Sequence, residues 1–121
     1  MVKILYVDDE LLNLKSFELL FRNEFVVLTA TSGEMALKII EENEIDVIIS
    51  DQKMPYMSGV ELLEKVARNN FNTLRIIHSG LFEKDEMLAV ALKNKVADFC
   101  LDKPLDEDRL REIINIHLSK K

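Results

Sequence analysis

A short run of β-branched residues, Val47, Ile48 and Ile49, constrains the fold more than any other stretch of the chain. The run contains no polar alternation, which is typical of a strand buried on both faces of a parallel sheet. Asp51 follows two residues later, and Pro55 prevents a strand or helix from continuing easily beyond it. The sequence therefore predicts a carboxylate at the carboxyl end of a central strand, where open α/β sheets place their ligand sites.

Strand and helix patterns alternate along the whole chain. Short apolar runs predict strands at residues 3–7, 25–29, 47–49, 74–79 and 97–101. Apolar residues at helical spacing follow each run, and the last two predicted helices cover residues 83–95 and 105–121. Five such units, with no linker between them, predict one α/β domain with a parallel sheet, helices on both faces and right-handed crossovers.

The sequence also predicts the inward face of the first helix and the capping residues of the second and third helices. In the first helix, the spacing favours an inward apolar face formed by Leu12, Phe17, Leu20 and Phe21. Thr31 is expected to cap the second helix, with Glu34 as its partner three residues later. Ser58 is expected to cap the third.

Composition and charge exclude several classes of function. The formal net charge is −6, which argues against a nucleic-acid surface, because phosphate binding needs clustered Lys and Arg. Cys100 is the only cysteine, so an internal disulfide is excluded and a reducing compartment is favoured. No charged and apolar leader and no membrane-length apolar run is found, so we expect a cytoplasmic domain without a membrane partner.

Polar residues follow four of the predicted strands: Asp8 and Asp9, Asp51, Ser79, and Lys103. Parallel strands deliver their last residues to one edge of the sheet, so these groups are expected to converge. Three carboxylates there would repel and raise one another's pKa values unless a cation joined them. Oxygen ligands alone select a hard ion such as Mg²⁺, while Lys103 and the Ser79 hydroxyl suit phosphoryl oxygens.

Each residue also has an ordinary structural explanation. Asp8 and Asp9 would cap the first helix, Ser79 would be a strand-end hydroxyl, and Lys103 would be solvated. The joint occurrence at four strand ends favours a shared site instead.

These residues resemble the motifs of the receiver domains of two-component response regulators, across the whole chain. The matching motifs are Asp8-Asp9, Asp51 with Met54-Pro55 and Gly59, Ser79-Gly80, and Lys103-Pro104. The resemblance implies a doubly wound five-stranded sheet of order 2-1-3-4-5, the flavodoxin-like receiver fold. It also implies that residues 1–121 are the receiver domain, and that any effector domain lies beyond Lys121.

The resemblance further implies the role of each site residue. Asp51 would accept a phosphoryl group from a sensor histidine kinase or phosphotransfer protein, with Ser79 and Lys103 binding the phosphoryl oxygens. Mg²⁺ would be bound by Asp8 through water, by Asp9, by Asp51 and by the backbone carbonyl of Lys53. Such a domain catalyses only its own phosphotransfer and slow dephosphorylation. Its surface of fourth helix, fifth strand and last helix would contact an effector domain or a second copy.

The chain departs from the family pattern near its fifth strand. Cys100 stands where the family usually has an aromatic switch residue, and Phe99 points to the opposite face of a strand. The switch is therefore expected to work without an aromatic rotamer change. Val96-Ala97 replaces the usual Gly-Ala, so this loop is expected to avoid a left-handed conformation.

Residues beside the site carry further expectations. Lys53 and Leu81 flank the approach of water to Asp51, and because Leu81 has no hydrogen-bonding group, a long-lived phosphoryl group is expected. His78 is expected to pack away from Ser79. Tyr56 and Met57 are expected to be loop or partner-contact residues.

Three other functions fit the sequence less well than that of a phosphorylated receiver. A haloacid dehalogenase-type phosphatase needs a second Asp two residues after the nucleophile, where Lys53 stands. A flavodoxin-like flavin carrier needs a first loop that cradles phosphate, which Asp8-Asp9-Glu10 would repel. A receiver that signals without phosphorylation would not need the intact acidic set.

Overall fold

The computed structural model describes residues 1–69, 72–80 and 86–119. Strands and helices alternate throughout this part of the chain, as the sequence predicts. In chain order they are β1 (Lys3–Val7), α1 (Leu11–Phe21), β2 (Val26–Ala30), α2 (Gly33–Glu42), β3 (Val47–Ser50), α3 (Gly59–Asn69), β4 (Leu74–His78), α4 (Glu86–Lys93), β5 (Phe99–Leu101) and α5 (Glu107–Ser119). Residues 83–85 of the predicted fourth helix lie outside the described residues.

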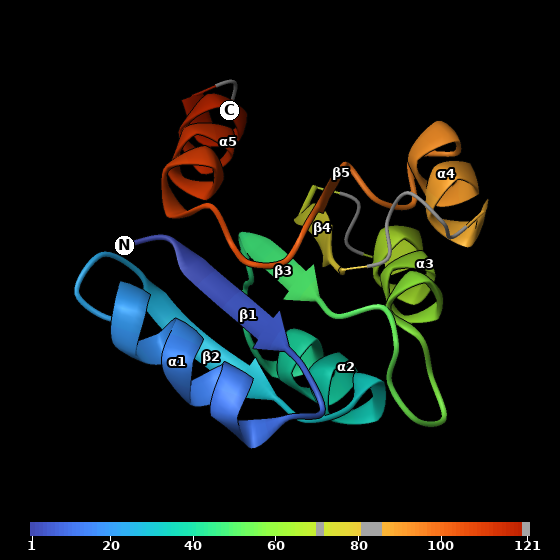
Figure 1. Ribbon diagram of the computed structural model, residues 1–121, viewed down its shortest axis with the longest axis horizontal. Coiled ribbons are helices and arrows are strands. Elements are labelled where there is room, and N and C mark those ends of the chain that lie inside the picture. The colour runs from blue at the N-terminus through green and yellow to red at the C-terminus, as the bar shows by residue number, and fades with distance from the viewer. Residues whose placement is uncertain (70–71, 81–85, 120–121) are drawn as a thin grey trace.

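The five strands form one parallel sheet in the order β2-β1-β3-β4-β5 (Figure 1), which confirms the predicted doubly wound topology. The buried run of Val47 and its neighbours is β3, at the centre of the sheet. The β1–β3 register pairs Val7 with Ser50. The next residue of each strand, Asp8 and Asp51, therefore leaves the sheet at the same edge.

Side chains of the strands alternate between two cores, one on each face of the sheet. One core joins the sheet to α1 and α5, and its buried strand residues are Ile4, Tyr6, Val47, Ile49, Leu74 and Ile76. The other joins the sheet to α2, α3 and α4, and its buried strand residues are Leu5, Val7, Ala30, Ile48 and Ile77. Figure 1 shows the two groups of helices on opposite sides of the sheet.

The predicted inward face of α1 is wrong at two of its four residues. Leu12 is 76% exposed and Leu20 is 48% exposed, whereas Leu14, Phe17 and Phe21 are buried. Phe17 stacks on Tyr6 of β1, with ring centroids 4.1 Å apart. This stacking accompanies a helix rotation in which positions 14, 17 and 21 face the sheet, and both arrangements have helical spacing in the sequence.

The cap of α2 is Ser32 and not Thr31. The Ser32 hydroxyl accepts a hydrogen bond from the Met35 amide at 3.1 Å, because Gly33 is the first helical residue and the cap precedes it. The Ser58 cap of α3 is confirmed. Ser58 Oγ accepts from the Glu61 amide and Glu61 Oε1 accepts from the Ser58 amide, each at 3.2 Å, a reciprocal capping box.

The loop between α4 and β5 contains a left-handed residue, contrary to expectation. Lys95, one position before the substituted pair, has φ 60°. The Val96 amide donates to the Ala91 carbonyl at 2.9 Å and the Lys95 amide donates to the Leu92 carbonyl at 3.2 Å. This is the Schellman pattern of helix ends, which requires one left-handed residue. The helix end therefore imposes the left-handed conformation on a lysine.

The buried Arg75 of β4 holds this loop in place. Its guanidinium donates to the carbonyls of Val96 and Lys95, both at 2.9 Å, and to that of Thr73 at 3.0 Å. Asp98 accepts from the Arg75 amide at 2.9 Å. Hydrogen bonds to three carbonyls compensate for burying the charge, and they support the strained Lys95 backbone.

Replacing Lys95 with asparagine should stabilise the protein. Asparagine tolerates the left-handed region better than lysine, so the free energy of unfolding should rise by about 0.5–1 kcal/mol. That corresponds to a melting midpoint roughly 2–4 °C higher for a chain of this size. Lys93→Asn, inside the last turn of α4, should lower the midpoint instead. A Lys95→Asn midpoint at or below the wild-type value would refute this account of the loop.

Candidate functional site

Asp8 is fully buried directly after β1. Its carboxylate accepts hydrogen bonds from the Glu10 amide at 3.0 Å and from the Asn13 side-chain amide at 3.1 Å. The cap position of α1 belongs to Glu10, whose side chain makes no capping bond. The capping explanation for Asp8 and Asp9 is therefore wrong, and another reason is needed for a buried carboxylate at this edge.

Asp51 follows β3 beside Asp8, as the strand register dictates. Its side chain is 15% exposed, and the Lys103 ammonium lies 3.4 Å from its Oδ1 and 3.6 Å from Oδ2 of Asp8. Asp9 is exposed on the outer side of the group. One carboxylate oxygen from each of the three aspartates lies within 4.8 Å of the others. The structure thus brings together four of the predicted site residues, from three strand ends.

The pKa of Asp51 is raised above its ordinary value. Burial is the largest cause, since it disfavours the ionised form, and the neighbouring Asp8 carboxylate adds to it. The Lys103 ammonium and the Gln52 amide, which donates to Asp51 Oδ1 at 3.0 Å, act in the opposite direction. Lys103 and the Gln52 amide offset burial and the Asp8 charge only in part, so a further cation at the site would favour the ionised form of Asp51.

The loop after Asp51 folds back against the carboxylate's own backbone. The buried Gln52 side chain accepts from the Val60 amide at 2.8 Å, and the Gly59 amide donates to the Gln52 carbonyl at 3.0 Å. A Cβ at Gly59 would collide with the Asp51 carbonyl oxygen, so only glycine fits there. Sequence reasoning missed Gln52 and Asn13, because nothing in their local pattern distinguishes a positioning amide from a surface one.

The remaining predicted site residues are Ser79, Lys53 and Leu81. Ser79 is buried at the end of β4, and its amide donates to the Leu101 carbonyl at 2.9 Å. Lys53 is exposed. Leu81, expected to flank the approach of water, lies outside the described residues. The metal role of the Lys53 carbonyl and the phosphoryl roles of Ser79 and Lys103 stay predictions.

Cys100, at the expected switch position, and its neighbour Phe99 point to opposite faces of the sheet, as predicted. Cys100 packs against the core beneath α2, α3 and α4, while Phe99 packs against the core beneath α1 and α5. No register change brings the Phe99 ring to the position of the family's aromatic switch.

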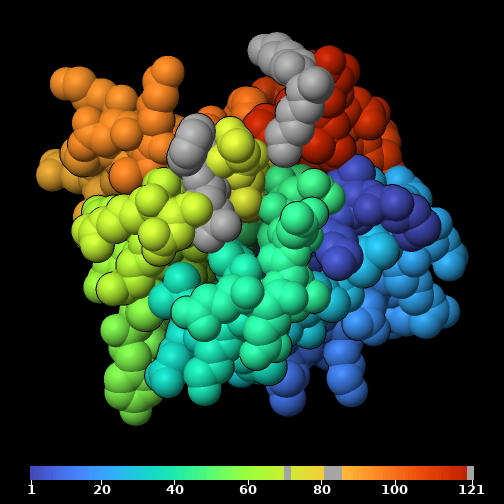
Figure 2. Space-filling model, turned by 180° about the vertical axis from the view of Figure 1, so that it is seen from behind, coloured from blue at the N-terminus to red at the C-terminus, as the bar shows by residue number. Residues whose placement is uncertain are grey.

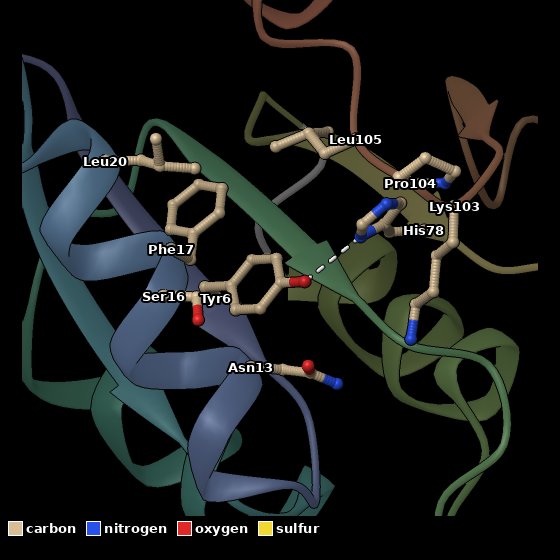
Figure 3. Close-up of a pocket in the computed structure, with 9 residues that line it drawn as sticks. All are labelled: Tyr6, Asn13, Ser16, Phe17, Leu20, His78, Lys103, Pro104 and Leu105. Carbon is tan, nitrogen blue, oxygen red and sulfur yellow. Dashed lines mark hydrogen bonds between the residues drawn. The ribbon is translucent and has the colours of Figure 1, made fainter.

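His78 has a packing role, as expected. Its Nδ1 forms a hydrogen bond with the Tyr6 hydroxyl at 3.0 Å, on the α1 face of the sheet (Figure 3). Burial lowers the pKa of His78 to about 4, with the Lys103 charge adding to this, and burial raises the pKa of Tyr6. Both side chains are therefore neutral near pH 7. They line a cavity of about 290 Å³ between α1 and residues 103–105.

Residues 4–115 match the response regulator receiver domain family. The hydrogenase transcriptional regulatory protein HoxA of Bradyrhizobium diazoefficiens is 31% identical over 111 residues, which cover 92% of this chain and 23% of that protein. The virulence sensor protein BvgS of Bordetella pertussis is 34% identical over 125 residues, covering 94% of this chain and 10% of that protein. The chain therefore spans a quarter or less of these two relatives.

Solved structures agree with this assignment. A response regulator receiver domain from Clostridium thermocellum has a TM-score of 0.88 and 32% identity, covering 99% of this chain and 96% of that one. The response regulator TrrA of Thermotoga maritima, solved in complex with Mg²⁺ and BeF, has a TM-score of 0.81 and 26% identity, covering 97% of this chain and 99% of that one.

The chain belongs to the response regulator receiver domain family, the signalling domains of two-component systems. The resemblance read from the strand-end motifs is confirmed at the level of family and fold. Among the described residues, no helix is both long enough and apolar enough to cross a membrane.

Replacing Asp51 with asparagine should stabilise the metal-free protein at pH 7. Because folding raises the Asp51 pKa, ionising this carboxylate destabilises the native state at pH values above the folded pKa. The stabilisation by Asp51→Asn should shrink as the pH falls through the pKa of Asp51 in the folded protein. It should disappear below the ordinary pKa of 3.8, where Asp51 is protonated in both the folded and the unfolded state. Thermal unfolding with EDTA, from pH 7 to pH 3.5, measures this.

Glu44→Gln is the matched control, since it removes one negative charge from an exposed loop position. Its midpoint should differ little from wild type. Equal midpoints for Asp51→Asn and wild type at pH 7, or a gain that grows on acidification, would contradict the electrostatic account.

Proposed function

We propose that Asp51 accepts a phosphoryl group from the phosphohistidine of a sensor kinase or phosphotransfer protein. The observation that carries this proposal is the convergence of Asp51 with two other aspartates and Lys103 at the carboxyl edge of the sheet. A carboxylate at this edge, partly open to solvent and beside a fixed ammonium, is suited to attack phosphorus. Family membership and the motifs at the strand ends support the same role.

The transfer exchanges one bond to phosphorus for another. An oxygen of the ionised Asp51 carboxylate forms the new P–O bond as the P–N bond of the donor's phosphohistidine breaks. The donor nitrogen keeps the electron pair and takes a proton from water. The raised pKa of Asp51 makes its carboxylate a better nucleophile than an ordinary aspartate, provided that it is ionised at the working pH.

Mg²⁺ fits the donor set of this edge. The three carboxylates supply only oxygen, and their oxygens are close enough to share one ion. Burial, with the Asp8 charge adding to it, raises the pKa of Asp51, and a bound cation would favour its ionised form. Asp8, Asp9 and Asp51 would hold the ion together with the Lys53 carbonyl, as the resemblance implies. When bound, it would offset charge on the transferring phosphoryl group. The TrrA complex with Mg²⁺ and BeF supports this assignment.

Lys103 and Ser79 complete the proposed acceptor site. The Lys103 ammonium lies 3.6 Å from a carboxylate oxygen of Asp8 and 3.4 Å from one of Asp51. It can therefore bind an oxygen of a phosphoryl group added to Asp51. The Ser79 hydroxyl would donate to a second oxygen. Such charge stabilisation is the main catalysis that phosphoryl transfer requires.

Phosphorylation would then change the contacts that the domain makes with a partner or effector domain in a cytoplasmic pathway. HoxA is named as a transcriptional regulatory protein and BvgS as a sensor protein, and these functions belong to chains several times longer than this one.

Asp51→Asn should abolish phosphate incorporation. With acetyl phosphate and Mg²⁺, the wild-type chain should take up acid-labile label at up to one phosphate per chain, and the variant none, because it lacks the nucleophilic oxygen. Asp46→Asn, whose carboxylate accepts from the Lys3 amide, is a matched control and should be labelled normally. Undiminished labelling of Asp51→Asn would overturn the assignment.

Mg²⁺ should raise the melting midpoint through Asp9. At about 10 mM Mg²⁺ and a dissociation constant on the order of 1 mM, the native state gains about 1.4 kcal/mol, which corresponds to a melting midpoint about 5–6 °C higher. Asp9→Ala should lose most of this rise, and because Asp9 is exposed, the variant should still fold. Glu10→Ala, the adjacent exposed carboxylate, should retain it. The same rise in Asp9→Ala and in wild type would exclude Asp9 as a ligand.

A further inference from the structure

The loop that follows Asp51 contains a strained residue, Tyr56. Its φ is 68°, and it shares positive φ only with Lys95 among the described non-glycine residues. The Met57 amide donates to the Pro55 carbonyl at 2.8 Å across Tyr56, closing a three-residue turn. A turn of this kind with positive φ is rare and unfavourable for a bulky side chain.

The fold makes no use of the Tyr56 side chain. Tyr56 is fully exposed, and the described part of the chain offers its ring no hydrogen bond and no ring contact. Its neighbours Met54 and Met57 instead pack against the core beneath α2, α3 and α4. Met57 is thus a packing residue, while the two methionines hold the turn that displays Tyr56. Figure 2 shows this green loop standing out from the surface.

The other left-handed residue, Lys95, has a structural cause. A Schellman turn requires that conformation, and Arg75 binds the carbonyl of Lys95. At Tyr56, asparagine or glycine would satisfy the same turn with less strain, and nothing buried would be lost. An aromatic ring held in solvent at the expense of backbone strain indicates a function outside the fold.

The position of Tyr56 indicates which molecule the ring meets. The loop leaves β3 at the carboxyl edge of the sheet, passes α2 and returns to α3 (Figure 1). Asp51 begins this loop, so a protein that brings its phosphohistidine to Asp51 must approach the same edge. Tyrosine is well suited to such a contact, because it buries a large area and loses little side-chain entropy.

We propose that Tyr56 is a contact residue for the protein that donates the phosphoryl group, binding an apolar patch beside the donor's phosphohistidine. The inference rests on the proposed function of Asp51. A protein donor would contact the ring while the phosphoryl group is transferred. A small donor such as acetyl phosphate reaches Asp51 without touching it, so the two kinds of donor separate recognition from chemistry.

The test compares two donors on three variants of the full chain. The donors are acetyl phosphate and an autophosphorylated sensor histidine kinase chosen because it labels the wild-type chain. Tyr56→Asn should slow transfer from the kinase about tenfold or more, leave labelling by acetyl phosphate unchanged, and raise the melting midpoint by about 2–4 °C. Tyr56→Phe, which keeps the ring, should retain most of the transfer from the kinase.

Lys95→Asn is the matched control, because it relieves the same backbone strain away from the site. It should gain stability and keep wild-type transfer from both donors. Wild-type kinase transfer in Tyr56→Asn would overturn the inference, and so would equal slowing with both donors, which would place the effect on the acceptor site. A failure of the proposed function would look different, because both donors would then label Asp51→Asn as fully as the wild-type chain.

Discussion

The pairing of β1 with β3 determines the chemistry of this receiver domain. Their parallel register sets Val7 against Ser50, and the next residue of each strand is an aspartate. Two carboxylates are thereby held at one edge by backbone hydrogen bonds that do not depend on their charge. Lys103, from the segment after β5, forms ion pairs with both. A shift of one residue in either strand would turn one carboxylate toward the opposite face.

The fold holds an electrostatically unfavourable cluster of carboxylates at this edge of the sheet. Burial and the Asp8 charge both raise the pKa of Asp51, and Lys103 offsets them only in part. The surrounding amides of Glu10, Asn13 and Gln52 fix the carboxylates in place. Because these carboxylates are held in fixed positions and their charge is compensated only in part, the site favours the binding of a further cation. Stability is lower than it would be with neutral residues, which is typical of functional sites.

The family, sheet order and central strand could be predicted, because each rests on a strong signal such as the β-branched run before Asp51. The rotation of α1 could not, because Leu12 with Leu20 and Leu14 with Phe21 both satisfy helical spacing. Only packing against the sheet distinguishes the two faces, since it buries Leu14 and leaves Leu12 and Leu20 exposed. The left-handed Lys95 was missed for a similar reason. A helix end creates the requirement, and the buried Arg75 that supports it lies 20 residues away in sequence.

The most direct test of the central claim is to identify which residue carries the phosphoryl group. Borohydride reduces an aspartyl phosphate to homoserine, and peptide mass spectrometry then locates that change. After treatment with acetyl phosphate and Mg²⁺, the account predicts homoserine at position 51 and at no other aspartate, including Asp8 and Asp9 in the same cluster. Homoserine at Asp8, at Asp9 or spread over several positions would contradict it, because Asp51 would then not be the acceptor that the fold positions.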